Sequence, residues 1–112
     1  MSLREAMIIM PTQDNRGSDL STQLASLQAE LTDIFGGCTV TNAMGSWKSD
    51  GAVQTEPVAC FAVASRQDQT SDDALLRIAD RYGAACGQES VYVRLFGGSV
   101  AFVTPEQKQQ AA

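Results

Sequence analysis

The chain has 112 residues, 44% of them hydrophobic and 19% charged, with a formal net charge of −5 and no histidine. This length and apolar content fit one folded domain and exclude a disordered chain. Without histidine there is no Ser-His or Cys-His catalytic pair and no His-ligated zinc, and the acidic balance argues against nucleic acid and anionic membranes as partners.

The first predicted strand is the short apolar run at residues 6–10, which stops at Pro11 and resembles a strand buried on both faces. A helix follows, with residues 18–19 as its expected cap and the glycines at 36–37 as its end. Its apolar stripe at helical spacing consists of Leu20, Leu24, Leu27, Leu31, Ile34 and Phe35.

The middle of the chain predicts a long hairpin. Residues 38–47 are rich in Thr and Val, the Asp-Gly pair at 50–51 favours a tight turn, and residues 52–65 form a second extended stretch. Pro57 lacks a backbone donor, so an edge, a bulge or a change of strand pairing is expected there.

A second helix is predicted from residues 70–73, with Gly87 as its end. Its apolar stripe consists of Leu75, Ile78, Ala79, Tyr82 and Cys86. Residues 90–96 and 99–103 are extended and meet at two glycines, as a tight hairpin or as one strand with a glycine bulge.

This order of elements predicts an α+β fold, a ferredoxin-like βαββαβ sandwich whose antiparallel sheet carries two helices on one face. We expect a single domain over residues 1–104 and a flexible tail over residues 105–112.

The second strand of the predicted hairpin has apolar residues on both faces. Phe61 and Val63 alternate with a second set, which consists of Val58, Cys60, Ala62 and Ala64. A sheet with two apolar faces predicts a homo-oligomer, a dimer or a trimer, joined face to face or through the long hairpin.

Cys38, Cys60 and Cys86 are an odd number without C-x-x-C spacing, which indicates reduced thiols and a cytoplasmic location. A bridge from Cys38 to Cys60 stays open as an alternative. The N-terminal residues lack the pattern of a signal peptide, and no apolar stretch is long enough to span a membrane.

Six residues are candidates for a ligand site, each with a structural alternative. Trp47 packs against a neighbour or stacks on a ligand, and Glu56 is either an exposed carboxylate or a base. Gln88, Glu89 and Ser90 follow the second helix, where Gln88 or Ser90 caps free backbone groups. The alternative is a small polar pocket of these three residues, completed by Tyr82, Arg94 or Arg66. Arg94 is solvated or contacts an anion on the open face of the sheet. We expect no metal and no cofactor.

Three blocks carry a resemblance: the Gly-Ser-Trp at 45–47, Glu56 nine residues after the tryptophan, and the Gly-Gln-Glu-Ser-Val at 87–91. They resemble an uncharacterised bacterial family, a domain of unknown function with G-x-W and G-Q-E-S-V blocks, which implies no activity. A weaker similarity to PII-like signalling proteins and copper-tolerance-type trimers implies three subunits with ligand clefts between them.

Two functions follow as hypotheses. The first is a non-enzymatic module that binds a small molecule or a protein through the open face or a cleft between subunits. The alternative is a small enzyme of the dimeric-barrel type, in which Glu56 or Glu89 transfers protons with Tyr82 and Arg94 on a small anionic substrate. An accessory protein of a phage or mobile element is also compatible with this small acidic chain.

Overall fold

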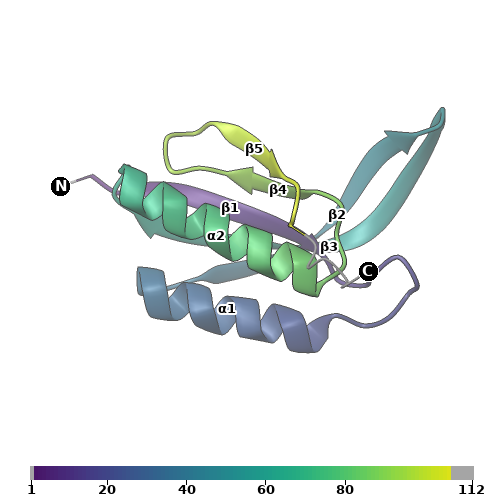
Figure 1. Ribbon diagram of the computed structural model, residues 1–112, viewed down its shortest axis with the longest axis horizontal. Helices are drawn as coiled ribbons and strands as arrows, with labels where there is room; N and C mark the ends of the chain where they lie inside the picture. The colour runs from purple at the N-terminus through teal and green to yellow at the C-terminus, as the bar shows by residue number, and fades with distance from the viewer. Residues whose placement is uncertain (1, 107–112) are drawn as a thin grey trace.

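The computed structural model describes residues 2–106, which form one five-stranded antiparallel sheet with two helices on one face (Figure 1). In chain order the elements are β1 (Arg4–Pro11), α1 (Ser21–Phe35), β2 (Thr39–Ser49), β3 (Ala52–Ser65), α2 (Gln69–Ala85), β4 (Val91–Arg94) and β5 (Val100–Val103). The strands lie in the order β2-β3-β1-β4-β5. This is a ferredoxin-like α+β architecture, and β5 is the optional second strand of the final hairpin that the sequence left open.

The core lies between the helices and one face of the sheet. Ile8 on β1 lies opposite Phe61 on β3, and both are fully or almost fully buried. The alternation expected along β3 is present: Phe61 and Val63 face the helices, while Cys60 and Ala62 occupy the other face.

Most of the predicted stripe of α1 packs onto this core, with Ile34 as an exposed exception. The expected cap at residues 18–19 is wrong by one to two positions. Leu20 occupies the N-cap, and the Asp19 carboxylate accepts the Ser21 N–H at 3.3 Å from just outside the helix. Gly36 ends the helix with φ +88°, a conformation that glycine adopts without a Cβ clash.

Helix α2 begins slightly earlier than predicted. Asp68 is its N-cap, and its side chain accepts the Ser71 N–H at 2.8 Å. Its predicted apolar stripe faces the core, and Leu75, Ile78 and Ala79 are buried there.

Strands β2 and β3 continue past the end of β1 and form a free two-stranded arm at residues 44–57. The pairing of β1 with β3 ends where Pro11 lies opposite Val58. Pro57 is therefore the position where strand pairing changes, which was one of the three alternatives predicted for it. The turn is the predicted one, with Asp50 at φ +50° and Gly51 at φ +81°. Figure 1 shows the arm projecting away from the sheet and helices.

The last two strands form a tight hairpin, which decides between the two alternatives left open for this segment. Pro105 beyond it is buried, and the Glu106 N–H donates to the Asp80 carboxylate at 2.7 Å. The rest of the predicted tail, residues 107–112, lies outside the described residues.

All three cysteines are free thiols. Cys38 packs against the core while Cys60 lies on the opposite face of the sheet, so the bridge left open as an alternative is absent. Within residues 2–106, neither helix combines the length and apolar character that crossing a membrane requires.

Candidate functional site

A pocket of about 510 Å³ lies where the arm leaves the sheet, on the face that the helices leave uncovered. We call it the arm pocket. Its lining residues come from β1, the loop after β1, the arm, the part of β3 next to the arm, the connection between α2 and β4, and the last two strands. They are Ile9, Pro11, Asn15, Trp47, Glu56, Val58, Gln88, Glu89, Ser90, Tyr92 and Phe102.

The sheet provides an apolar and aromatic floor. Ile9 lies opposite Tyr92, and Tyr92 lies opposite Phe102, so the three side chains form one row across β1, β4 and β5. The two rings meet edge to face, with centroids 5.5 Å apart and planes at 83°. Phe102 is 68% exposed, so its ring is available to a ligand or a partner.

The arm provides one wall. Gly45 lies directly opposite Glu56, and Trp47 follows two residues along β2, so Trp47 and Glu56 share a face of the arm. A Cβ at Gly45 would lie 3.2 Å from Cγ1 of Val58, and the missing side chain therefore keeps space open beside Glu56. Trp47 is 47% exposed.

The connection between α2 and β4 provides the opposite wall. Gly87 adopts φ +68°, and the Gln88 N–H turns back to the Gly83 carbonyl at 2.9 Å, which closes the helix. The side-chain Nε2 of Gln88 donates to the Cys86 carbonyl at 3.1 Å. The structural role expected for Gln88 is therefore present, and it holds the residues that follow at the edge of the pocket. Figure 1 shows this connection running beside the base of the arm.

The arm pocket carries negative charge without compensation. Among the described residues that line it, Glu56 and Glu89 are charged and none is basic. Among residues 2–106 neither carboxylate has a hydrogen-bond or ion-pair partner. Burial raises the pKa of the Glu56 carboxyl above its ordinary value, because the ionised form loses water without gaining a partner.

These groups suit a ligand that combines a flat ring with a positive charge. Aromatic faces attract both, through stacking and through the attraction of a cation to the ring quadrupole. Unpaired carboxylates gain a partner only from a cation or a hydrogen-bond donor. A ligand of this kind would also give Glu56 and Glu89 the hydrogen-bond or ion-pair partner that the fold does not provide.

Four of the six residues predicted as site residues line this pocket. They are Trp47, Glu56, Gln88 and Glu89. Tyr92 and Phe102 were not predicted, although the alternation that places Arg94 on the open face also places Tyr92 there. Phe102 could not be placed without the register of the final hairpin.

The structure does not bring Tyr82 to the pocket. Its hydroxyl donates to the Glu30 carboxylate at 2.9 Å, between the two helices. Arg81 donates to both oxygens of Glu30, at 2.7 and 2.6 Å, and this bidentate contact holds the pKa of Glu30 below its ordinary value. Burial and the Glu30 carboxylate raise the pKa of Tyr82.

Arg94 is on the open face, as predicted, but outside the pocket. Its guanidinium donates to the Glu5 carboxylate at 2.9 Å. The proton-transfer enzyme considered above required Tyr82 and Arg94 beside Glu56 or Glu89, and the structure does not assemble that set.

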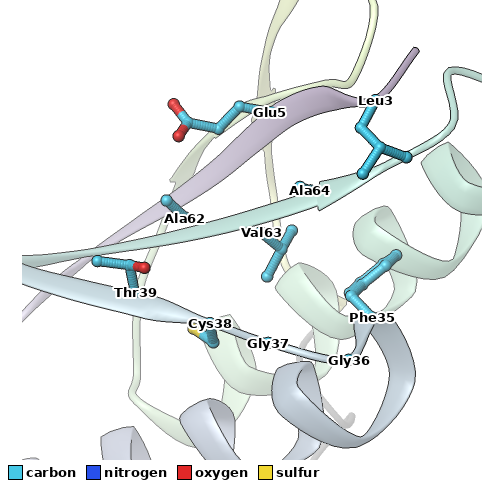
Figure 2. Close-up of a pocket in the computed structure, with 10 residues that line it drawn as sticks. All are labelled: Leu3, Glu5, Phe35, Gly36, Gly37, Cys38, Thr39, Ala62, Val63 and Ala64. Atoms are coloured by element: carbon cyan, nitrogen blue, oxygen red, sulfur yellow. The ribbon is translucent and has the colours of Figure 1, made fainter. Parts of the chain in front are cut away.

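A second pocket, of about 380 Å³, lies near the end of α1 (Figure 2). Its one charged lining residue is Glu5, which is paired with Arg94 and whose carboxylate points away from Phe35 and Cys38 in the figure. Burial raises the pKa of Cys38, which keeps that thiol protonated and unreactive. The arm pocket is therefore the stronger candidate.

No family model and no curated protein matches the chain, so the resemblance to an uncharacterised bacterial family is not confirmed. Solved structures share its fold. A phage SAM lyase in the apo state superposes with a TM-score of 0.66 at 16% identity, over 96% of this chain and 93% of that one. A phage SAM lyase in complex with S-methyl-5′-thioadenosine gives 0.68 at 14% identity, over 93% and 91%. The divalent ion tolerance protein CutA1 from Ehrlichia chaffeensis gives 0.49 at 5% identity, over 98% and 89%, which is too low for any argument. At these identities the likeness to the two lyase structures shows a common fold.

Proposed function

We propose that this chain binds S-adenosylmethionine in the arm pocket and cleaves it to S-methyl-5′-thioadenosine. The observation that carries the proposal is the combination of three aromatic rings with two carboxylates that have no partner and no basic neighbour in the pocket lining within residues 2–106. S-adenosylmethionine has a flat adenine, a sulfonium cation and an ammonium group, which are the features that such a lining attracts. The fold shared with phage SAM lyases adds support.

The proposed reaction needs no protein acid or base. An oxygen of the substrate's own carboxylate attacks Cγ of the aminobutyrate arm, and the Cγ–S bond breaks with its electron pair going to sulfur. The sulfonium becomes a neutral thioether, and the arm becomes homoserine lactone, which keeps its ammonium. Atoms and charge balance without water or a proton, so a pocket without histidine is suited to this step.

The contribution of the pocket is to position the substrate on an apolar floor. Glu56 and Glu89 would hold the ammonium and sulfonium, so that the substrate carboxylate lies behind Cγ in line with the breaking bond. The reaction joins a negative and a positive charge into neutral groups. Apolar floor residues such as Ile9 and Val58 favour that loss of charge, because they solvate ions less well than water does.

The proposal includes a homo-oligomer in the cytoplasm, a dimer or a trimer. The arm exposes large apolar side chains, among them Met44 at 65% and Val53 at 69%. A second copy that covered the arm would bury these residues and enclose the adjoining pocket. Light scattering on the purified chain tests this part, and a monomer at micromolar concentration contradicts it.

A non-enzymatic module that binds the same ligand is the second candidate. It is favoured by the exposure of Trp47 and Phe102 and by the pairing of Tyr82 and Arg94 with carboxylates outside the pocket. The two candidates bind the same ligand, and only the lyase converts it into products.

The test is to incubate the chain with S-adenosylmethionine and to quantify both products by liquid chromatography and mass spectrometry. A protein-free sample corrects for spontaneous breakdown, and Glu56→Gln serves as the site variant. Equal amounts of methylthioadenosine and homoserine lactone, formed faster than in both controls, support the lyase. Saturable binding without products overturns the lyase and supports the binding module, and absence of binding overturns both.

A further inference from the structure

We infer that the arm pocket selects its ligand by charge, retaining the sulfonium form and releasing the neutral thioether, with Glu56 and Glu89 as the specificity-determining side chains. This inference rests on the proposed function and adds to it what distinguishes substrate from product.

Within the part of the chain that the structure describes, no basic side chain pairs with the negative charge of the pocket. Arg94 is the basic residue of the open face nearest in register to Tyr92, and its guanidinium is engaged by Glu5. Lys48 follows Trp47 in β2 and therefore lies on the other face of the arm. A positive charge on the ligand is thus the partner that the two carboxylates lack.

Shape cannot provide the same discrimination. S-adenosylmethionine differs from its cleavage product by the whole aminobutyrate arm, but a sulfonium and the thioether that remains after loss of one methyl group differ only by that methyl group and the charge, and the adenosine that both carry is identical. Trp47 and Phe102 are about half and two thirds exposed, so these two rings do not enclose a ligand tightly enough to reject one additional methyl group. Charge is the remaining difference, and both the aromatic faces and the carboxylates respond to it.

Release of product follows from the same feature. Cleavage leaves methylthioadenosine without a charge, so it loses the attraction of Glu56 and Glu89 at the moment it forms. Adenine nucleotides carry phosphates, and the same carboxylates repel them. The pocket would therefore discriminate among adenosine compounds by their charge, without specific contacts to the adenine.

The test uses two ligands that differ by one methyl group and one charge and that lack the cleavable arm: methylthioadenosine and its S-methylated form, the dimethylsulfonium. Dissociation constants are measured by calorimetry for the native chain, Glu56→Gln and Glu89→Gln. Glu30→Gln is the matched control, because Glu30 lies between the helices, away from the pocket. Circular dichroism verifies that each variant is folded.

We expect the native chain to bind the sulfonium at least about tenfold more tightly than the thioether, the size expected from one cation–π contact and one partly exposed ion pair. In Glu56→Gln and Glu89→Gln this ratio falls to about twofold to threefold, whereas Glu30→Gln keeps it. Added salt lowers the ratio in the native chain because it screens the carboxylates.

Equal affinity for the two ligands in the native chain overturns the inference, as does a ratio that persists in both pocket variants. Neither result affects the proposed cleavage, which is read from the products of S-adenosylmethionine. Formation of those products together with equal affinity would leave the proposed function standing and the charge selection wrong. Absence of binding by both ligands overturns the inference as well.

Discussion

The two faces of the sheet differ in how completely their apolar side chains are buried and their charged side chains are paired. On the covered face, Ile8 and Phe61 are buried, and Glu30 between the helices accepts hydrogen bonds from Arg81 and Tyr82. On the open face beside the arm, Trp47 stays about half exposed and Glu56 has no partner within residues 2–106. The covered face therefore contributes stability, whereas the arm pocket keeps unsatisfied groups that a ligand can use.

The largest expected effect is the difference in stability between replacing a phenylalanine of the core and one of the pocket. Phe61→Ala removes a fully buried ring and should lower the free energy of unfolding by about 3–5 kcal/mol. Phe102→Ala on the exposed rim of the pocket should cost less than about 1 kcal/mol. Urea unfolding measures both, and equal losses would contradict the assignment of core and pocket.

Glu56→Gln should change activity strongly and stability little. We expect cleavage of S-adenosylmethionine to fall by about a hundredfold, because the substrate loses a charged contact that positions it. The free energy of unfolding should stay unchanged or rise by less than about 1 kcal/mol, since the variant removes a carboxylate that burial destabilises when ionised. A clear loss of stability would show that Glu56 is structural.

The raised pKa of Glu56 determines how the stability of the chain depends on pH. A carboxyl whose pKa is higher in the folded chain than in the unfolded chain favours folding more as pH falls through the folded value. The stability advantage of Glu56→Gln should therefore be present at neutral pH and disappear in acid.

Trp47→Leu tests the aromatic wall. Affinity for S-adenosylmethionine should fall by about tenfold through loss of the cation–π contact, while leucine keeps most of the apolar surface. Isothermal calorimetry measures this change, and Trp47→Phe should recover part of it. Unchanged affinity in Trp47→Leu would remove Trp47 from the site.

The smallest effect concerns the helices. Glu30→Gln should lower the free energy of unfolding by about 1 kcal/mol at neutral pH, because a partly exposed charged hydrogen bond has that order of magnitude. The pKa of Glu30 is depressed in the folded chain, so its contribution is present at neutral pH and is lost as pH falls through that depressed value. Thermal unfolding at two pH values checks this, and cleavage should not change.

Local rules explain which parts of this fold were predictable. The helical stripes and the Asp50-Gly51 turn depend on neighbours in sequence, and the structure contains them except for Ile34, which is exposed. That turn also sets the register of the arm, which places Trp47 and Glu56 on the same face of it. The β5 strand remained undecided because two glycines allow either a hairpin or a bulge.

Contacts between distant segments were not predictable in the same way. The Tyr82 hydroxyl could have turned toward Gln88 on its own helix end, but its partner is Glu30 on the other helix. Arg94 pairs with Glu5, and the two residues come from opposite ends of the chain. The meeting of Gln88 and Glu89 with the arm likewise depends on how α2 packs on the sheet, which no local pattern encodes.

The most direct test of the central claim uses Trp47, the single tryptophan of the chain. Its fluorescence, excited at a wavelength that adenine does not absorb, should change saturably on titration with S-adenosylmethionine, and the titration should shift to higher ligand concentration in Glu56→Gln but not in Glu30→Gln. A spectrum that stays constant up to millimolar ligand, or a titration identical in the native chain and Glu56→Gln, would contradict binding in the arm pocket.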